Sequence, residues 1–106
     1  FDGLAVRVPV AVGSMCDIVF LLKKKTTVEE INKNFVKVCS TAKFKNFVEA
    51  SNEPLVSSDI VGNEHSAIVD LSLTKVIGGN LAKVIVWYDN EWGYSNRLAD
   101  LIKYLF

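Results

Sequence analysis

Leu81–Asn96, with the sequence LAKVIVWYDNEWGYSN, joins two hydrophobic periodicities within one short stretch. From Leu81 to Tyr88 every residue except Lys83 is apolar, β-branched or aromatic, which predicts a central strand covered on both faces. Asp89 and Asn90 interrupt the run, and apolar residues at helical spacing follow: Tyr94, Leu98, Leu101, Ile102 and Leu105. The stretch therefore predicts a strand that turns directly into a helix. Short polar side chains at such a turn lie past the carboxyl end of the strand, a common position for ligand groups.

The residue identities here are more specific than the periodicity. The ungapped motif WYDNE-x-GYSNR, residues 87–97, resembles the segment near the C-terminus of phosphorylating glyceraldehyde-3-phosphate dehydrogenases. From the residues alone, Asn90 is either a helix cap or a ligand contact, and Trp87 and Trp92 are expected to close a core. The resemblance implies that Asn90 holds the nicotinamide carboxamide of NAD. It also implies that Tyr94 lies at the cofactor, with support from Tyr88 and Glu91.

A second candidate lies in the opening sequence FDGLAVRVPV. Its larger apolar residues alternate with other residues, which predicts a strand over about Gly3–Val8. In such a strand Arg7 would lie on the face opposite the most apolar residues. An ordinary surface arginine is the favoured interpretation until the family is considered. The run resembles the family's strand ending in R-V-P, which implies that Arg7 binds a phosphate associated with the substrate, a task that suits the planar guanidinium. After Pro9 the chain departs from the family's usual Thr-Pro-Asp/Asn-Val-Ser, since residues 10–14 are VAVGS.

The remaining segments predict an α+β fold with a mainly antiparallel or mixed sheet and two helices on one face. A capping box at Thr27 and Glu30 opens an amphipathic helix. Two glycines and Asn80 predict a hairpin. The expected elements are strands over Met15–Leu22, Phe44–Ala50, His65–Leu71, Leu73–Ile77 and Leu81–Tyr88, and a helix over Val28 to about Thr41.

Composition limits the function classes. The 106 residues are 50% hydrophobic and suffice for one modest domain with a core. Twelve basic and twelve acidic residues leave no net charge, so we expect neither a nucleic-acid nor a membrane partner, and the lysine cluster of residues 23–45 is interpreted as a solvated face. Cys16 and Cys39 lack metal-ligand spacing, and His65 is the only histidine, so no metal site and a reduced, cytoplasmic protein are expected.

The resemblance covers residues 1–106 and implies the C-terminal part of the family's catalytic domain, a partial domain. The family's Rossmann NAD-binding domain, its S-C-T-T-N-C segment with the nucleophilic cysteine, and its base histidine have no counterpart in these residues. Cys16 and Cys39 do not match that motif, and His65 is interpreted as structural. The chain also opens without Met and ends within a helical pattern, so it is interpreted as a piece of a larger protein. We therefore expect no catalytic residue in this chain and no turnover from it alone.

For the intact parent, the resemblance implies a glycolytic homotetramer. Such an enzyme converts glyceraldehyde 3-phosphate, NAD and inorganic phosphate to 1,3-bisphosphoglycerate and NADH. Two other classes stay open. One is a non-catalytic binding module whose lysine-rich edge contacts RNA or protein, with Phe44 and Phe47 as the only candidate stacking aromatics. The other is an oligomerisation module, which would explain strands that are apolar on both faces.

Overall fold

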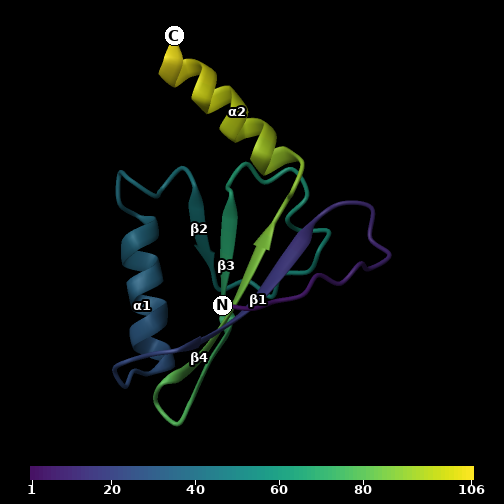
Figure 1. Ribbon diagram of the computed structural model, residues 1–106. Helices are drawn as coiled ribbons and strands as arrows, with labels where there is room; N and C mark the ends of the chain where they lie inside the picture. The colour runs from purple at the N-terminus through teal and green to yellow at the C-terminus, as the bar shows by residue number, and fades with distance from the viewer.

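β4 (Leu81–Tyr88) is an interior strand with the predicted bounds. The computed structural model describes residues 1–106, and its other elements are β1 (Ser14–Leu21), α1 (Val28–Cys39), β2 (Val48–Ser51), β3 (Ala67–Ile77) and α2 (Trp92–Leu105) (Figure 1). The strand order is β1-β4-β3-β2, with β4 antiparallel to both neighbours and β2 parallel to β3. This mixed sheet with two helices confirms the predicted α+β class.

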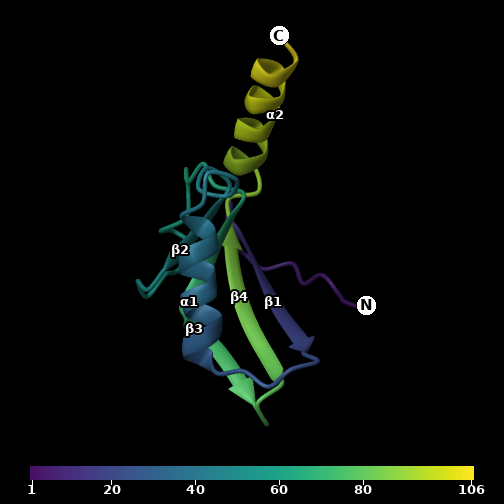
Figure 2. The same ribbon diagram turned by 90° about the vertical axis from the view of Figure 1, so that its left-hand side faces the viewer.

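α1 lies over β2 and β3, and the core forms between them (Figure 2). Val69, Leu71 and Val84 are buried there against the partly buried Phe35, Val48, Ala50 and Val86. Thr27 caps the helix by accepting a hydrogen bond from the Glu30 N–H at 3.2 Å, as the capping box predicts. The Asn32 side chain ties α1 to the sheet, because its Nδ2 donates to the Leu71 carbonyl at 2.9 Å.

α2 does not share the face that α1 covers. It starts directly after β4 and extends beyond the end of the sheet (Figures 1 and 2), so of the two helices only α1 packs on the sheet. The side chain of Trp92, expected in a core, is 54% exposed at the start of this helix. Because α2 lies beyond the end of the sheet, the sheet offers it no face to pack on.

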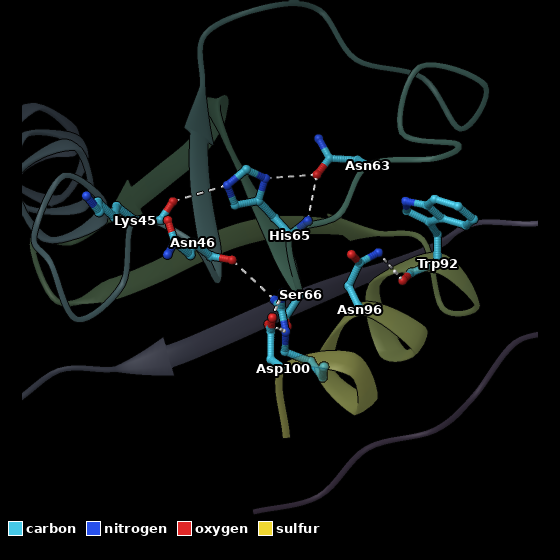
Figure 3. A network of polar contacts seen from close by, with 9 residues as sticks. Lys45, Asn46, Asn63, His65, Ser66, Trp92, Asn96 and Asp100 are labelled. Carbon is cyan, nitrogen blue, oxygen red and sulfur yellow. Dashed lines mark hydrogen bonds and ion pairs between the residues drawn. The ribbon is translucent and has the colours of Figure 1, made fainter. Parts of the chain in front are cut away.

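The first turns of α2 are nevertheless fixed to the body of the molecule. Arg97 pairs with Asp100 at 2.8 Å, donates to the Asn46 carbonyl and the Ser66 hydroxyl at 3.2 and 3.1 Å, and lies 4.7 Å from the centre of the Phe47 ring. Figure 3 shows this network beside the one around His65. Gly93 is buried against the His65 carbonyl, where a Cβ would approach within 2.9 Å of the oxygen. Glycine therefore permits the close approach of α2 to the segment before β3.

Four predicted strands differ from those observed. Gly3–Val8 forms no strand, because no neighbouring strand pairs with its backbone. Most of Phe44–Ala50 is turn, since hydrogen bonds such as Lys45 N–H to the Thr41 carbonyl close it locally, and β2 begins only at Val48. The strands expected at 65–71 and 73–77 are a single strand, β3, with a register irregularity between Asp70 and Lys75.

No helix of the chain has both the length and the apolar character needed to cross a membrane.

Candidate functional site

The candidate site lies where the end of β4 meets the beginning of β1. Ser14 is paired with Tyr88 in the antiparallel ladder, so the residues just before β1 and just after β4 are neighbours. The Asn90 Oδ1 accepts hydrogen bonds from the Gly13 N–H at 3.3 Å and from the Ser14 hydroxyl at 3.2 Å. Asn90 is otherwise exposed. Its carboxamide is thus held on the oxygen side, while its NH2 group forms no hydrogen bond within the chain.

The turn from β4 into α2 depends on Asp89 rather than on Asn90. Asp89 is 4% exposed, and its Oδ1 accepts hydrogen bonds from the N–H groups of Glu91 and Trp92 at 3.0 and 2.8 Å. Its Oδ2 accepts from the Gly62 N–H at 2.8 Å. The Gly62 amide, followed by the Trp92 amide, holds the pKa of this carboxyl below its ordinary value, since these donors favour the charged form. Asp89 therefore satisfies the orphan N–H groups of the helix start, and Asn90 is not a helix cap.

A surface hollow of about 360 Å³ lies at this same end of the sheet. It is lined by Val12, Val61, Gly62, Asp89, Glu91, Trp92 and Ser95. Two of these residues flank Asn90 in the chain, and Val12 precedes the Gly13 amide that contacts it. The hollow thus combines an apolar wall with two carboxylates, as small-molecule sites commonly do, and Asn90 adjoins it in the chain without lining it.

Four of the five predicted site residues lie in the segment that runs from the end of β4 into α2, and of these only Glu91 lines the hollow. Tyr88 is half-buried at the end of β4, Asn90 and Glu91 follow it, and Tyr94 projects from the first turn of α2 with 65% exposure. Arg7 does not join them. The segment before β1 that contains it runs away from the sheet (Figure 2), and Arg7 itself is exposed and forms no hydrogen bond or ion pair. The structure thus gives Arg7 no strand to orient it, because the strand predicted around it does not form.

His65 has the contacts of a structural residue, in agreement with the interpretation from sequence. Its Nδ1 lies 3.0 Å from the Asn63 Oδ1, and its Nε2 lies 3.2 Å from the Lys45 carbonyl (Figure 3). Both ring nitrogens are therefore engaged within the chain. The thiol of Cys39, at the end of α1, has its pKa raised by burial, which opposes thiolate formation.

Sequence reasoning missed the two residues that hold Asn90. Gly13 has a φ of 98°, and a Cβ at this position would lie 2.9 Å from the Ile60 Cδ1. In the sequence, Gly13 departs from the family pattern given above, whereas Ser14 keeps the serine with which that pattern ends.

Comparison with known proteins gives one consistent family. The model for the glyceraldehyde 3-phosphate dehydrogenase C-terminal domain matches residues 1–90. The glyceraldehyde-3-phosphate dehydrogenase of Mycobacterium avium is 52% identical over 101 residues, and that of Mycolicibacterium smegmatis is 50% identical over the same length; both matches cover 95% of this chain. Glyceraldehyde-3-phosphate dehydrogenase 2 of Staphylococcus aureus is 48% identical over 99 residues, or 93% of the chain.

The chain spans 28–29% of the length of these relatives. Its similarity extends over nearly all of its own length and confirms the resemblance first seen in the motif of residues 87–97. The family model matches well over half of the chain. The chain therefore belongs to the glyceraldehyde 3-phosphate dehydrogenase C-terminal domain family.

Proposed function

We propose that this chain is the nicotinamide-anchoring part of a phosphorylating, NAD-dependent glyceraldehyde-3-phosphate dehydrogenase, and that Asn90 holds the carboxamide of the cofactor. One observation carries the proposal: Asn90 stands at the carboxyl end of the central strand with its oxygen bound to the protein and its NH2 group free. The helix-cap alternative loses its support, because Asp89 already accepts the hydrogen bonds of the helix start.

The chemistry of the carboxamide suits this role. The nicotinamide carboxamide offers a carbonyl oxygen as acceptor, and the free NH2 of Asn90 is a donor. A hydrogen bond between them would restrict rotation of the nicotinamide about its glycosidic bond. The face of the ring that receives hydride would then be set before reaction, which is how positioning contributes to rate.

The other proposed roles are supporting ones. Tyr94, which projects from α2, and Tyr88 would pack beside the cofactor, and Glu91 would form part of the wall of the hollow. Arg7 would bind the phosphate of the substrate or inorganic phosphate through its planar fork. The nucleophilic cysteine and base histidine would come from other parts of the intact enzyme, a homotetramer that produces 1,3-bisphosphoglycerate and NADH. A polypeptide limited to these 106 residues should accordingly show no turnover.

The test is Asn90→Ala in the full-length enzyme. Loss of one positioning hydrogen bond should lower kcat and kcat/KM for NAD by about fivefold, since a typical bond is worth about 1 kcal/mol. Asn96→Ala is the matched control, because the Asn96 side chain donates to the Trp92 carbonyl within α2 and serves the helix alone. Equal kinetics for the wild type and Asn90→Ala, with only a lower melting temperature, would refute the proposal.

One observation favours a second candidate, an oligomerisation module. Met15, Val19 and Leu21 share one face of β1 with Asp17, which lies between the first two, and are 47%, 59% and 78% exposed. Ile18 pairs with the core residue Val84, so these three side chains point to the face opposite α1. An RNA-binding role has less support, because Phe44 and Phe47 already stack against Lys43 and Arg97 at 5.2 and 4.7 Å.

A further inference from the structure

Asn90 contacts two residues at the start of β1 that are far from it in the chain. Ser14 precedes it by 76 positions and Gly13 by 77. Ser14 begins β1 opposite Tyr88, the last residue of β4. The antiparallel ladder therefore fixes the Ser14 side chain beside the turn that carries Asn90. This placement follows from strand register and not from local sequence.

The donors at this contact decide which way the carboxamide of Asn90 faces. A backbone N–H can only donate, so the atom of Asn90 that faces the Gly13 amide must be the oxygen. The Ser14 hydroxyl donates to the same oxygen. Rotating the carboxamide by 180° would set its NH2 group against the Gly13 N–H, donor against donor, and would forfeit that hydrogen bond.

The backbone at position 13 requires glycine. The φ of 98° at Gly13 belongs to the region that favours glycine, and the buried Ile60 side chain fills the space where a Cβ would lie. Any other residue here would have to move the backbone, the Ile60 side chain, or both. The donor pair is thus one backbone amide, at a position that requires glycine, and one hydroxyl at the start of a strand.

We infer that Ser14, together with the Gly13 amide, is a positioning residue that orients Asn90 so that its NH2 group is presented to the nicotinamide carboxamide oxygen. This inference rests on the proposed function of Asn90. Ser14 acts through Asn90 and does not itself touch the cofactor. Of the two donors, Ser14 can be removed by substitution without altering the backbone.

The experiment compares Ser14→Thr with Ser14→Val in the full-length enzyme. These side chains are nearly equal in size and shape and both suit a strand, but only threonine keeps the hydroxyl. We expect Ser14→Thr to retain kcat/KM for NAD, and Ser14→Val to lose about two- to tenfold, the effect of one hydrogen bond. Ser40→Ala is the control for loss of a serine hydroxyl elsewhere, because Ser40 donates to the Lys37 carbonyl at the end of α1.

A double-substitution cycle separates a positioning role from a structural one. If Ser14 acts through Asn90, Ser14→Val should cause no further loss of kcat/KM for NAD in an Asn90→Ala background. Equal kinetics for the threonine and valine variants, or the same loss from Ser14→Val in both backgrounds, would overturn the inference. A normal Asn90→Ala enzyme would instead refute the proposed function, so the two failures are distinguishable.

Discussion

Asp89 offers a direct test of how the strand is joined to the helix. We compare Asp89→Ala with Asp89→Asn. Alanine removes every acceptor, leaving the N–H groups of Gly62, Glu91 and Trp92 without their partner. Loss of the cap at the helix start costs about 1 kcal/mol, and loss of the charge-assisted bond from Gly62 costs about 2 kcal/mol. Asp89→Ala should therefore lower the free energy of unfolding by about 3 kcal/mol.

Asparagine should cost less, because it keeps one oxygen. If the asparagine oxygen faces Glu91 and Trp92, the hydrogen bonds that cap α2 are kept. The asparagine NH2 group then faces the Gly62 N–H, and that hydrogen bond is lost. We expect a loss of about 1 to 2 kcal/mol. The control is Asp59→Asn, because Asp59 is exposed and accepts only the Val56 N–H, so its loss should stay below about 1 kcal/mol.

The pH dependence provides a second measurement. The pKa of Asp89 is lower in the folded state than its ordinary value of 3.8, so its contribution to stability is present above the unfolded pKa. That contribution is lost as the pH falls through the folded pKa. The difference in unfolding free energy between the wild type and Asp89→Asn should therefore have its maximum value at pH 7 and decrease below about pH 4. Urea unfolding curves that give the same difference at pH 7 and pH 2.5, or no difference at either, would refute this account.

Three further changes test other features. Gly93→Ala should destabilise the chain by about 1 to 3 kcal/mol in urea unfolding, because the alanine Cβ would lie 2.9 Å from the His65 carbonyl oxygen. This cost should outweigh the better helix propensity of alanine. Substitution of the exposed Ser95 on the same helix, Ser95→Ala, is the control. Arg7→Lys in the full-length enzyme should keep the fold and lose about 1 to 3 kcal/mol of transition-state stabilisation; unchanged kcat/KM for both aldehyde and phosphate would remove Arg7 from the site. A polypeptide of residues 1–106 should self-associate through the exposed Met15, Val19 and Leu21, and light scattering that shows a monomer at high concentration would contradict this.

The parts of the fold that could be predicted are those with local determinants. β4 has the predicted bounds because its apolar run ends sharply at Asp89. The start of α1 is marked by Thr27, whose hydroxyl accepts the Glu30 N–H. Gly78 and Gly79 take φ values of 61° and 81° in the hairpin between β3 and β4. In each case neighbouring residues supply the groups that form the structure.

The segments that were predicted wrongly depend on partners that a single sequence does not reveal. Gly3–Val8 alternates as a strand should, yet alternation alone cannot satisfy backbone N–H and carbonyl groups without a neighbouring strand. The helical pattern of α2 was visible, but its placement depends on the contact of Gly93 with His65, which is distant in the sequence. The donors to Asn90 required the register of β1 against β4, which residues 10–14 do not encode locally.

Asp89 and Asn90 are neighbours with similar side chains, and their order is chemically determined. Position 89 must accept hydrogen bonds from Gly62 and from the start of α2 on opposite oxygens, which a carboxylate can do and a carboxamide cannot. Position 90 needs one acceptor for Gly13 and Ser14 and, in its proposed role, one free donor, which a carboxylate lacks. If the two residues were exchanged, the asparagine at position 89 would place its NH2 group against the Gly62 amide. The aspartate at position 90 would bring a negative charge and no NH2 donor to the proposed cofactor site. The sequence Asp-Asn thus separates the residue that forms the turn from the residue that is proposed to bind the cofactor.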